Sequence, residues 1–110
     1  MTDRNTNLFD AVPENRSDEE FTTLLETGQF KLVRIVSTGQ ATPDGEWYDQ
    51  PEAEWVVVLR GRAGLVFEDE PGEHILEEGD FIDIAPRRRH RVSWTDETKP
   101  TVWLALHYNS

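Results

Sequence analysis

The chain contains no cysteine, and it has no long run of apolar residues. Without cysteine it can form no disulfide, no Cys-based zinc site and no thiol nucleophile, and a reducing cytoplasm is the location we expect. No apolar segment approaches the ~20 residues of a membrane-spanning helix, so we expect no membrane partner. The first residues lack a basic segment followed by an apolar one, which argues against a signal peptide.

Basic residues are scarce, because 11 Lys and Arg stand against 22 Asp and Glu, for a formal net charge of −11. Such an acidic surface repels phosphate backbones, so we predict that nucleic acid is not a partner. The 110 residues suit one domain that is large enough to bury a core. We expect residues 1–16, which are mostly polar, to form an N-terminal arm and residues 17–110 to form a single domain.

One short helix is predicted before the first strand. Ser17 and Glu20 match a capping box, Phe21, Leu24 and Leu25 follow at helical spacing, and a glycine then ends the pattern. These signals favour a helix over residues 18–27. A helix this short needs to pack against the rest of the domain.

Strand patterns fill most of the remaining chain. They are short, rich in Val, Ile and Leu, and separated by turn residues; they cover residues 30–37, 55–59, 63–67, 74–76, 81–84, 91–94 and 101–108. Short strands with a turn every eight to twelve residues are typical of an all-β sandwich or barrel.

Two segments resemble the signature motifs of the cupins. The first cupin motif contains His-x-His, then Glu, six residues and Gly. Here Glu54 and Gly61 keep the six-residue gap, and Tyr48 and Gln50 stand where the two histidines are expected. The second cupin motif contains Gly, Pro, His and Asn. The chain matches it with Gly79, Pro86 and His90, and replaces the Asn with Trp94.

The resemblance implies an all-β cupin fold, which is a double-stranded β-helix or RmlC-like jelly-roll barrel, preceded here by the short helix. The chain looks like one of the small single-domain cupins that are mostly uncharacterised. The resemblance also implies a homodimer. Trp55 supports a dimer independently, because it lies on the outward face of its expected strand and needs cover from the helix, another strand or a partner subunit.

The resemblance further implies metal-ligand positions at Tyr48, Gln50, Glu54 and His90. Carboxylate and imidazole are good ligands for a divalent ion such as Zn, Mn, Fe or Ni, whereas a glutamine carbonyl is weaker and tyrosine binds as phenolate. His107, on the last expected strand, is a weaker candidate for a further imidazole ligand. The implied function is a polar pocket inside the barrel that binds a metal and a small organic molecule.

The sequence leaves a second interpretation open. The same polar side chains can satisfy one another without a metal, which would make the chain a metal-free small-molecule binding or interaction module. Strand alternation puts Glu54 and Val56 on one face, so Val56 is expected to line the pocket together with Trp47 and Trp94. No Gly-x-Ser-x-Gly motif is present, and the fold by itself does not specify a reaction.

The one basic cluster, residues 87–91, has two interpretations. It could capture an anionic substrate at the mouth of the barrel, or it could be a surface loop whose arginines pair with the many acidic residues. His74 lies beside an expected loop and is predicted to be a surface residue.

Overall fold

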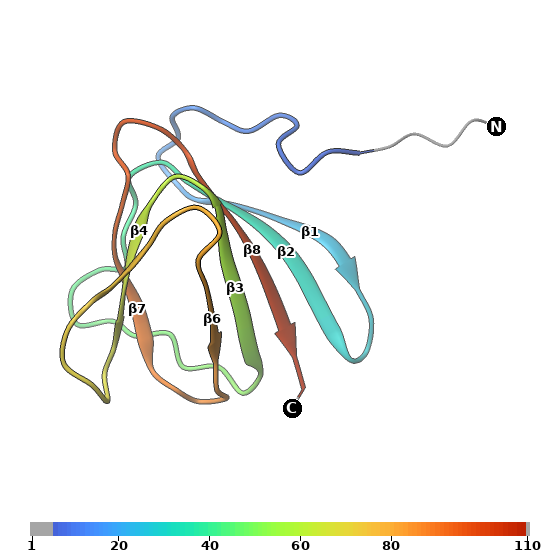
Figure 1. Cartoon of the computed structure of the whole chain (residues 1–110). Coiled ribbons are helices and arrows are strands. Elements are labelled where there is room, and N and C mark those ends of the chain that lie inside the picture. The colour runs from blue at the N-terminus through green and yellow to red at the C-terminus, as the bar shows by residue number, and fades with distance from the viewer. Residues whose placement is uncertain (1–5, 110) are drawn as a thin grey trace.

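The computed structural model describes residues 6–109, which form eight strands in two antiparallel sheets (Figure 1). The strands are β1 (Glu20–Glu26), β2 (Phe30–Ser37), β3 (Ala53–Arg60), β4 (Ala63–Phe67), β5 (His74–Leu76), β6 (Phe81–Ile84), β7 (His90–Thr95) and β8 (Thr101–Tyr108). One sheet has the order β1-β2-β8-β3-β6 and the other the order β5-β4-β7. The prediction of an all-β fold is therefore confirmed.

The core lies between the two sheets. In β3 the alternation of side chains sends Val56 and Val58 inward, as predicted, and both belong to the buried cluster. In β8 the inward residues are Trp103 and Ala105, a choice that periodicity alone left open. The other sheet contributes Leu65 and its neighbours, so the cluster joins the two layers; the full set is Val56, Val58, Ala63, Leu65, Phe67, Leu76, Ile84, Trp103 and Ala105.

The predicted helix at residues 18–27 is wrong, because this segment forms strand β1 and residues 6–109 contain no helix. β1 pairs antiparallel with β2, and its register shifts between Thr23 and Leu25. The β-bulge interrupts the two-residue alternation of the strand, so this segment does not show a regular strand pattern in its sequence. Pairing with β2 therefore outweighs a helical signal that is weak in a segment this short. Since no helix is present in the described residues, none there could span a membrane.

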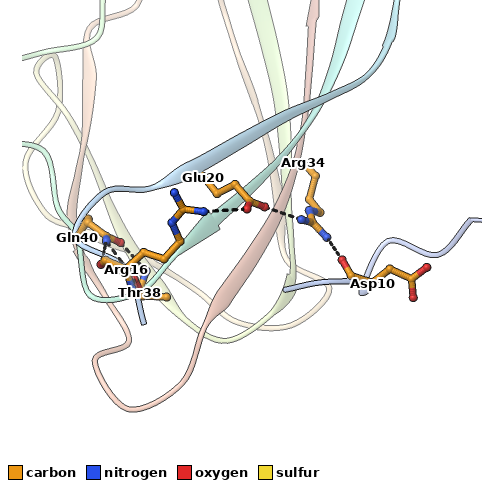
Figure 2. A network of polar contacts seen from close by, with 6 residues as sticks. All are labelled: Asp10, Arg16, Glu20, Arg34, Thr38 and Gln40. Carbon is orange, nitrogen blue, oxygen red and sulfur yellow. Dashed lines mark hydrogen bonds and ion pairs between the residues drawn. The ribbon is translucent and has the colours of Figure 1, made fainter. Parts of the chain in front are cut away.

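A buried arginine ties the N-terminal segment to the outer face of the larger sheet (Figure 2). Arg34 of β2 is 7% exposed, and its Nη1 donates to the carbonyl oxygens of Leu8, at 3.1 Å, and Asp10, at 2.7 Å. Its Nη2 forms an ion pair of 2.5 Å with Glu20, which Arg16 also contacts at 3.3 Å. Glu20, which was expected to be part of a helix cap, thus helps to anchor the N-terminal segment through ion pairs with Arg34 and Arg16.

Trp55 points to the outer face of β3, as its position in the strand predicts. The ring of Phe81, on the adjacent strand β6, lies 5.3 Å from it between centroids. Phe81 itself is 62% exposed. Phe81 of the neighbouring strand therefore covers part of Trp55, and the two rings form an apolar patch that is exposed at Phe81.

The β3–β4 turn depends on Gly61, which has a φ of +89°. A Cβ at this position would lie 2.5 Å from Thr101 Oγ1 and 2.7 Å from the Thr101 Cα. Gly79 has nearly the same φ, +90°, but a Cβ there would meet nothing within 4 Å. Alanine substitutions at the two glycines therefore distinguish the cost of a left-handed backbone, which both share, from the cost of a steric clash, which only position 61 has.

We predict that Gly79→Ala lowers the free energy of unfolding by about 1 kcal/mol, because only the left-handed backbone is strained. Gly61→Ala should lose about 2 kcal/mol more, because the methyl group also forces the start of β8 away. Urea unfolding of the two variants and the wild type measures the difference. Equal losses in the two variants would contradict the tight packing of the turn against Thr101.

Candidate functional site

A cavity of about 300 Å³ opens on the inner face of the larger sheet. Its middle is apolar, lined by Val33, Ile35, Val56 and Trp103, with Ile84, Leu65 and Val92 closing the other sides. Five polar side chains that contact one another also line it, and we call their position the polar end: Tyr48, Gln50, Glu54, His90 and His107. All five residues proposed as metal ligands from the sequence are therefore brought to one cavity, together with Val56.

Glu54 is the centre of the polar end, and we call Glu54, Gln50, His90 and His107 the Glu54 cluster. The Gln50 amide donates to Glu54 Oε1 at 2.9 Å, and His90 Nε2 lies 3.4 Å from the same oxygen. His107 Nε2 lies 3.9 Å from Oε2. The Glu54 side chain is only 12% exposed, so these contacts offset the cost of burying its charge.

The strands explain how these groups meet. Glu54 on β3 and His107 on β8 are direct cross-strand partners, so their side chains share a face. His90, at the start of β7, reaches the cluster from the other sheet. An isolated antiparallel bridge joins it to Tyr48, with the Tyr48 N–H donating to the His90 carbonyl at 2.8 Å. This bridge places the two motif segments side by side.

One tautomer of neutral His90 is held by the backbone. Its Nδ1 donates to the carbonyl of Arg88 at 2.8 Å, which leaves Nε2 facing Glu54. Burial alone would lower the pKa of His90. The hydrogen bond to Glu54, the bond to the Arg88 carbonyl and the negative charge of Glu54 together outweigh burial and raise this pKa above its ordinary value. The protonated imidazole of His90 is therefore favoured by its position beside the Glu54 carboxylate.

Tyr48 stacks on His90, with ring centroids 5.6 Å apart, and is itself 42% exposed. Burial of its hydroxyl and the negative charge of Glu19 raise the pKa of Tyr48, with a smaller contribution from Glu54. The phenol therefore stays protonated near neutral pH. In this state Tyr48 is a hydrogen-bond donor rather than an anionic ligand.

The donor types around Glu54, one carboxylate and two imidazoles, suit a divalent first-row metal. Their positions as they stand do not form a metal centre: within residues 6–109, no group of three or more His, Asp or Glu side chains is arranged to hold an ion. Gln50 turns its amide N–H toward Glu54, and Tyr48 keeps its proton. Any metal would therefore depend on Glu54, His90 and His107.

Three other residues singled out in the sequence lie away from the cavity. Trp47 lies under the guanidinium of Arg91, 5.7 Å from its ring centroid, and Trp94 lies at the same distance from Arg62. Neither tryptophan lines the cavity. His74 is at the surface, where it contacts Glu70.

The arginines of residues 87–91 point to acidic partners on the surface rather than into the cavity. Arg88 pairs with Asp69 at 3.1 Å and lowers the pKa of that carboxyl through this hydrogen bond. The remaining pairs are Arg87–Asp49, Arg89–Glu68 and Arg91–Asp44. None of the four arginines lines the cavity, which favours the interpretation of a surface loop with compensated charges.

Two charged residues of the cavity were not singled out by the sequence. Lys31 lines the polar end beside its strand partner His107, and Glu19 lines the cavity near the other end of β2, where it accepts a hydrogen bond from the Ser37 hydroxyl. Ser37 also accepts a hydrogen bond of 3.0 Å from the indole of Trp103. The alternation of Lys31, Val33 and Ile35 along β2 contains a signal for Lys31, because these residues share a face. Glu19 lies just before β1 and depends on the strand that the helix prediction missed.

Comparison with known families places the chain among the cupins. The model of the cupin domain matches residues 33–107, which is most of the chain, so this protein belongs to the cupin family. That result confirms the resemblance carried by Glu54, Gly61, Gly79, Pro86 and His90. No curated protein matches the chain.

Solved structures agree with this assignment. A crystal structure from Ralstonia eutropha JMP134, described as a "putative mannose-6-phosphate isomerase", is 44% identical, with a TM-score of 0.95 over 98% of this chain and 100% of that one. A cupin superfamily protein from Desulfitobacterium hafniense DCB-2 is 12% identical (TM-score 0.77, covering 100% and 95%). An RmlC-like cupin from Methanocaldococcus jannaschii is 14% identical (TM-score 0.71, covering 99% and 93%). These last two show the shared double-stranded β-helix alone.

Proposed function

We propose that this cupin binds a small organic molecule in the cavity, with the Glu54 cluster contacting the polar part of the ligand. The observation that carries this proposal is the division of the cavity into an apolar middle and a polar end. Such a cavity, with few polar groups that converge on one place, is typical of small-molecule sites. A volume of about 300 Å³ suits a compact ligand rather than a polymer.

The polar end is able to exchange protons with a ligand. Neutral His90 presents Nε2 as an acceptor, and its protonated form returns that proton as a donor, with Glu54 stabilising the charge. Tyr48 adds a neutral donor beside it. These groups support recognition of a carbonyl, hydroxyl or acid group, and they would support proton transfer if the ligand is a substrate.

A thermal-shift screen of small organic molecules, repeated with EDTA, tests this proposal. Mannose 6-phosphate belongs in the screen because of the description of the Ralstonia protein. A ligand at a hundredfold excess over its Kd should stabilise the fold by about 2.7 kcal/mol, which raises Tm by on the order of 10 °C.

Matched variants on β1 show whether a hit occupies the cavity. Thr23 lines it, whereas its neighbour Thr22 is on the other face of the strand. Thr23→Trp should remove the thermal shift by filling the cavity, and Thr22→Trp should preserve it. A shift that survives equally in both variants would place the ligand elsewhere.

A divalent metal in the Glu54 cluster is a second candidate. It is favoured by the backbone bond that holds His90 Nδ1 and directs Nε2 to the cluster, an orientation common among metal-binding histidines. Glu54, His90 and His107 would hold the ion. When bound, a divalent ion supplies Lewis acidity and lowers the pKa of bound water.

Metal content of the purified, untagged chain tests this candidate, measured by inductively coupled plasma mass spectrometry after incubation with Zn, Mn, Fe or Ni. We expect near-stoichiometric metal in the wild type, and loss of it in Glu54→Ala and His90→Ala, because each removes a ligand. His74→Ala is the matched control, since this histidine is at the surface. If the wild type takes up none of the four metals, the metal candidate is wrong and the metal-free proposal stands.

We also propose that the chain forms a homodimer. β1 is an edge strand in the larger sheet, and it exposes Phe21, Leu24 and Leu25 by 61%, 42% and 52%. An edge strand with exposed apolar side chains readily pairs with another strand.

Light scattering after size exclusion measures the mass of the assembly. Leu25→Arg should give a monomer, because it places a charge in the interface. Ile75 is a matched control, because it is equally exposed, at 52%. Ile75→Arg should leave the dimer intact, because Ile75 lies on β5, an edge strand of the other sheet. The opposite pattern would move the interface to β5.

A further inference from the structure

The floor of the cavity is a regular ladder of cross-strand neighbours. Its first row, which we call the polar row, runs through direct strand partners Glu26, Lys31, His107 and Glu54. The next two rows are mostly apolar, and they are Thr23, Val33, Ala105, Val56 and then Phe21, Ile35, Trp103, Val58. Because alternate residues on a strand are about 7 Å apart, a ligand that spans two or three rows has one polar end and an apolar body.

Lys31 is the positive charge of this floor. It is the one Lys or Arg that lines the cavity within the described residues, and it forms no ion pair there. Most arginines of the described residues, by contrast, pair with a carboxylate within 4 Å. In a chain with twice as many acidic as basic residues, an unpaired lysine in a cavity is a free partner for an anion.

The neighbours of Lys31 favour an anion at this end. Glu54 already accepts a hydrogen bond from Gln50 and faces two imidazoles, so its carboxylate is engaged inside the cluster. Glu19 is bound to Ser37, at the other end of β2 from Lys31, and would repel an anion bound there. Glu26 lies directly opposite Lys31 on β1 but forms no ion pair with it in the described structure, so the positive charge of Lys31 is available to a negative group at this end.

A second hollow, of about 420 Å³, adjoins the polar row and connects it with solvent. It shares Lys31, Gln50 and His107 with the cavity. Lys31 is exposed and lines both hollows, so the head group of a ligand bound to it can stay partly hydrated while its carbon skeleton is buried.

We infer that Lys31, with His107 beside it, is the head-group subsite for the carboxylate of a small amphiphilic organic acid, whose apolar body lies on Val33, Ile35 and Trp103. The inference rests on the proposed function, since it names the class of ligand. A phosphate dianion fits this end less well, because no arginine between residues 6 and 109 lines the cavity to bind it through two parallel hydrogen bonds.

Pairs of an acid and its neutral amide test the inference: cyclohexanecarboxylate with cyclohexanecarboxamide, benzoate with benzamide, and hexanoate with hexanamide. Affinities are measured by NMR titration at neutral pH. Each acid should bind at least about tenfold more tightly than its amide, the effect of one charge-assisted contact. Lys31→Gln should remove this preference, and Lys31→Arg should retain it because the positive charge remains. Lys99→Gln is the matched control, since Lys99 is the other lysine of the chain and does not line the cavity.

The outcomes separate the inference from the proposed function. Amides that bind as tightly as acids, or an acid preference that persists in Lys31→Gln, would overturn the carboxylate subsite while cavity binding stands. The carboxylate subsite is also wrong, and cavity binding still stands, if no acid binds but the broad screen yields a neutral ligand whose binding is lost in Thr23→Trp. If neither the pairs nor the broad screen yields a ligand, both proposals fail.

Discussion

The pairing register of β8 between β2 and β3 is the constraint on which the rest of the structure depends. β8 pairs with β2 without a break from Thr101 to Tyr108, and its register with β3 shifts only past Val58. Because side chains alternate, a slip of one residue would turn Trp103 and His107 outward. The apolar floor of the cavity and its polar end are therefore two consequences of the same hydrogen-bonded ladder.

The buried carboxylate of Glu54 is the most demanding feature that this register creates. A carboxylate in an apolar cavity is costly unless its oxygens receive hydrogen bonds or positive charge. Its three neighbours come from separate segments, with Gln50 just before β3, His107 on β8 and His90 on β7 of the opposite sheet. The groups that stabilise Glu54 thus link the two sheets, and they are also the groups that a ligand would meet.

Local patterns predicted much of this arrangement. The alternation in residues 55–59 correctly placed Val56 inward and Trp55 outward, and the spacing of the two motifs identified Glu54 and His90. The faces of residues 101–108 could not be distinguished, because both carry large apolar side chains. The helix was predicted because Phe21 and Leu24 are at helical spacing in the sequence, and the bulge of β1 hides the strand alternation. Only pairing with β2 makes this segment a strand. The positions of Trp47 and Trp94 next to the motifs suggested a pocket, yet their rings lie against arginines instead.

The sequence by itself determined the strand-rich character of the chain, its acidic surface, its lack of thiol chemistry and the two motif segments that carry Glu54 and His90. These are properties of composition and of residues close together in the chain, so local preferences are enough to specify them. The tertiary structure alone decided which charges are compensated. It pairs the arginines of residues 87–91 with distant acids, leaves Lys31 without such a partner in the described structure, and gathers His107 and His90 around Glu54. The physical reason is that charge compensation depends on distances of a few ångströms between segments that are far apart in the sequence, and strand pairing sets those distances.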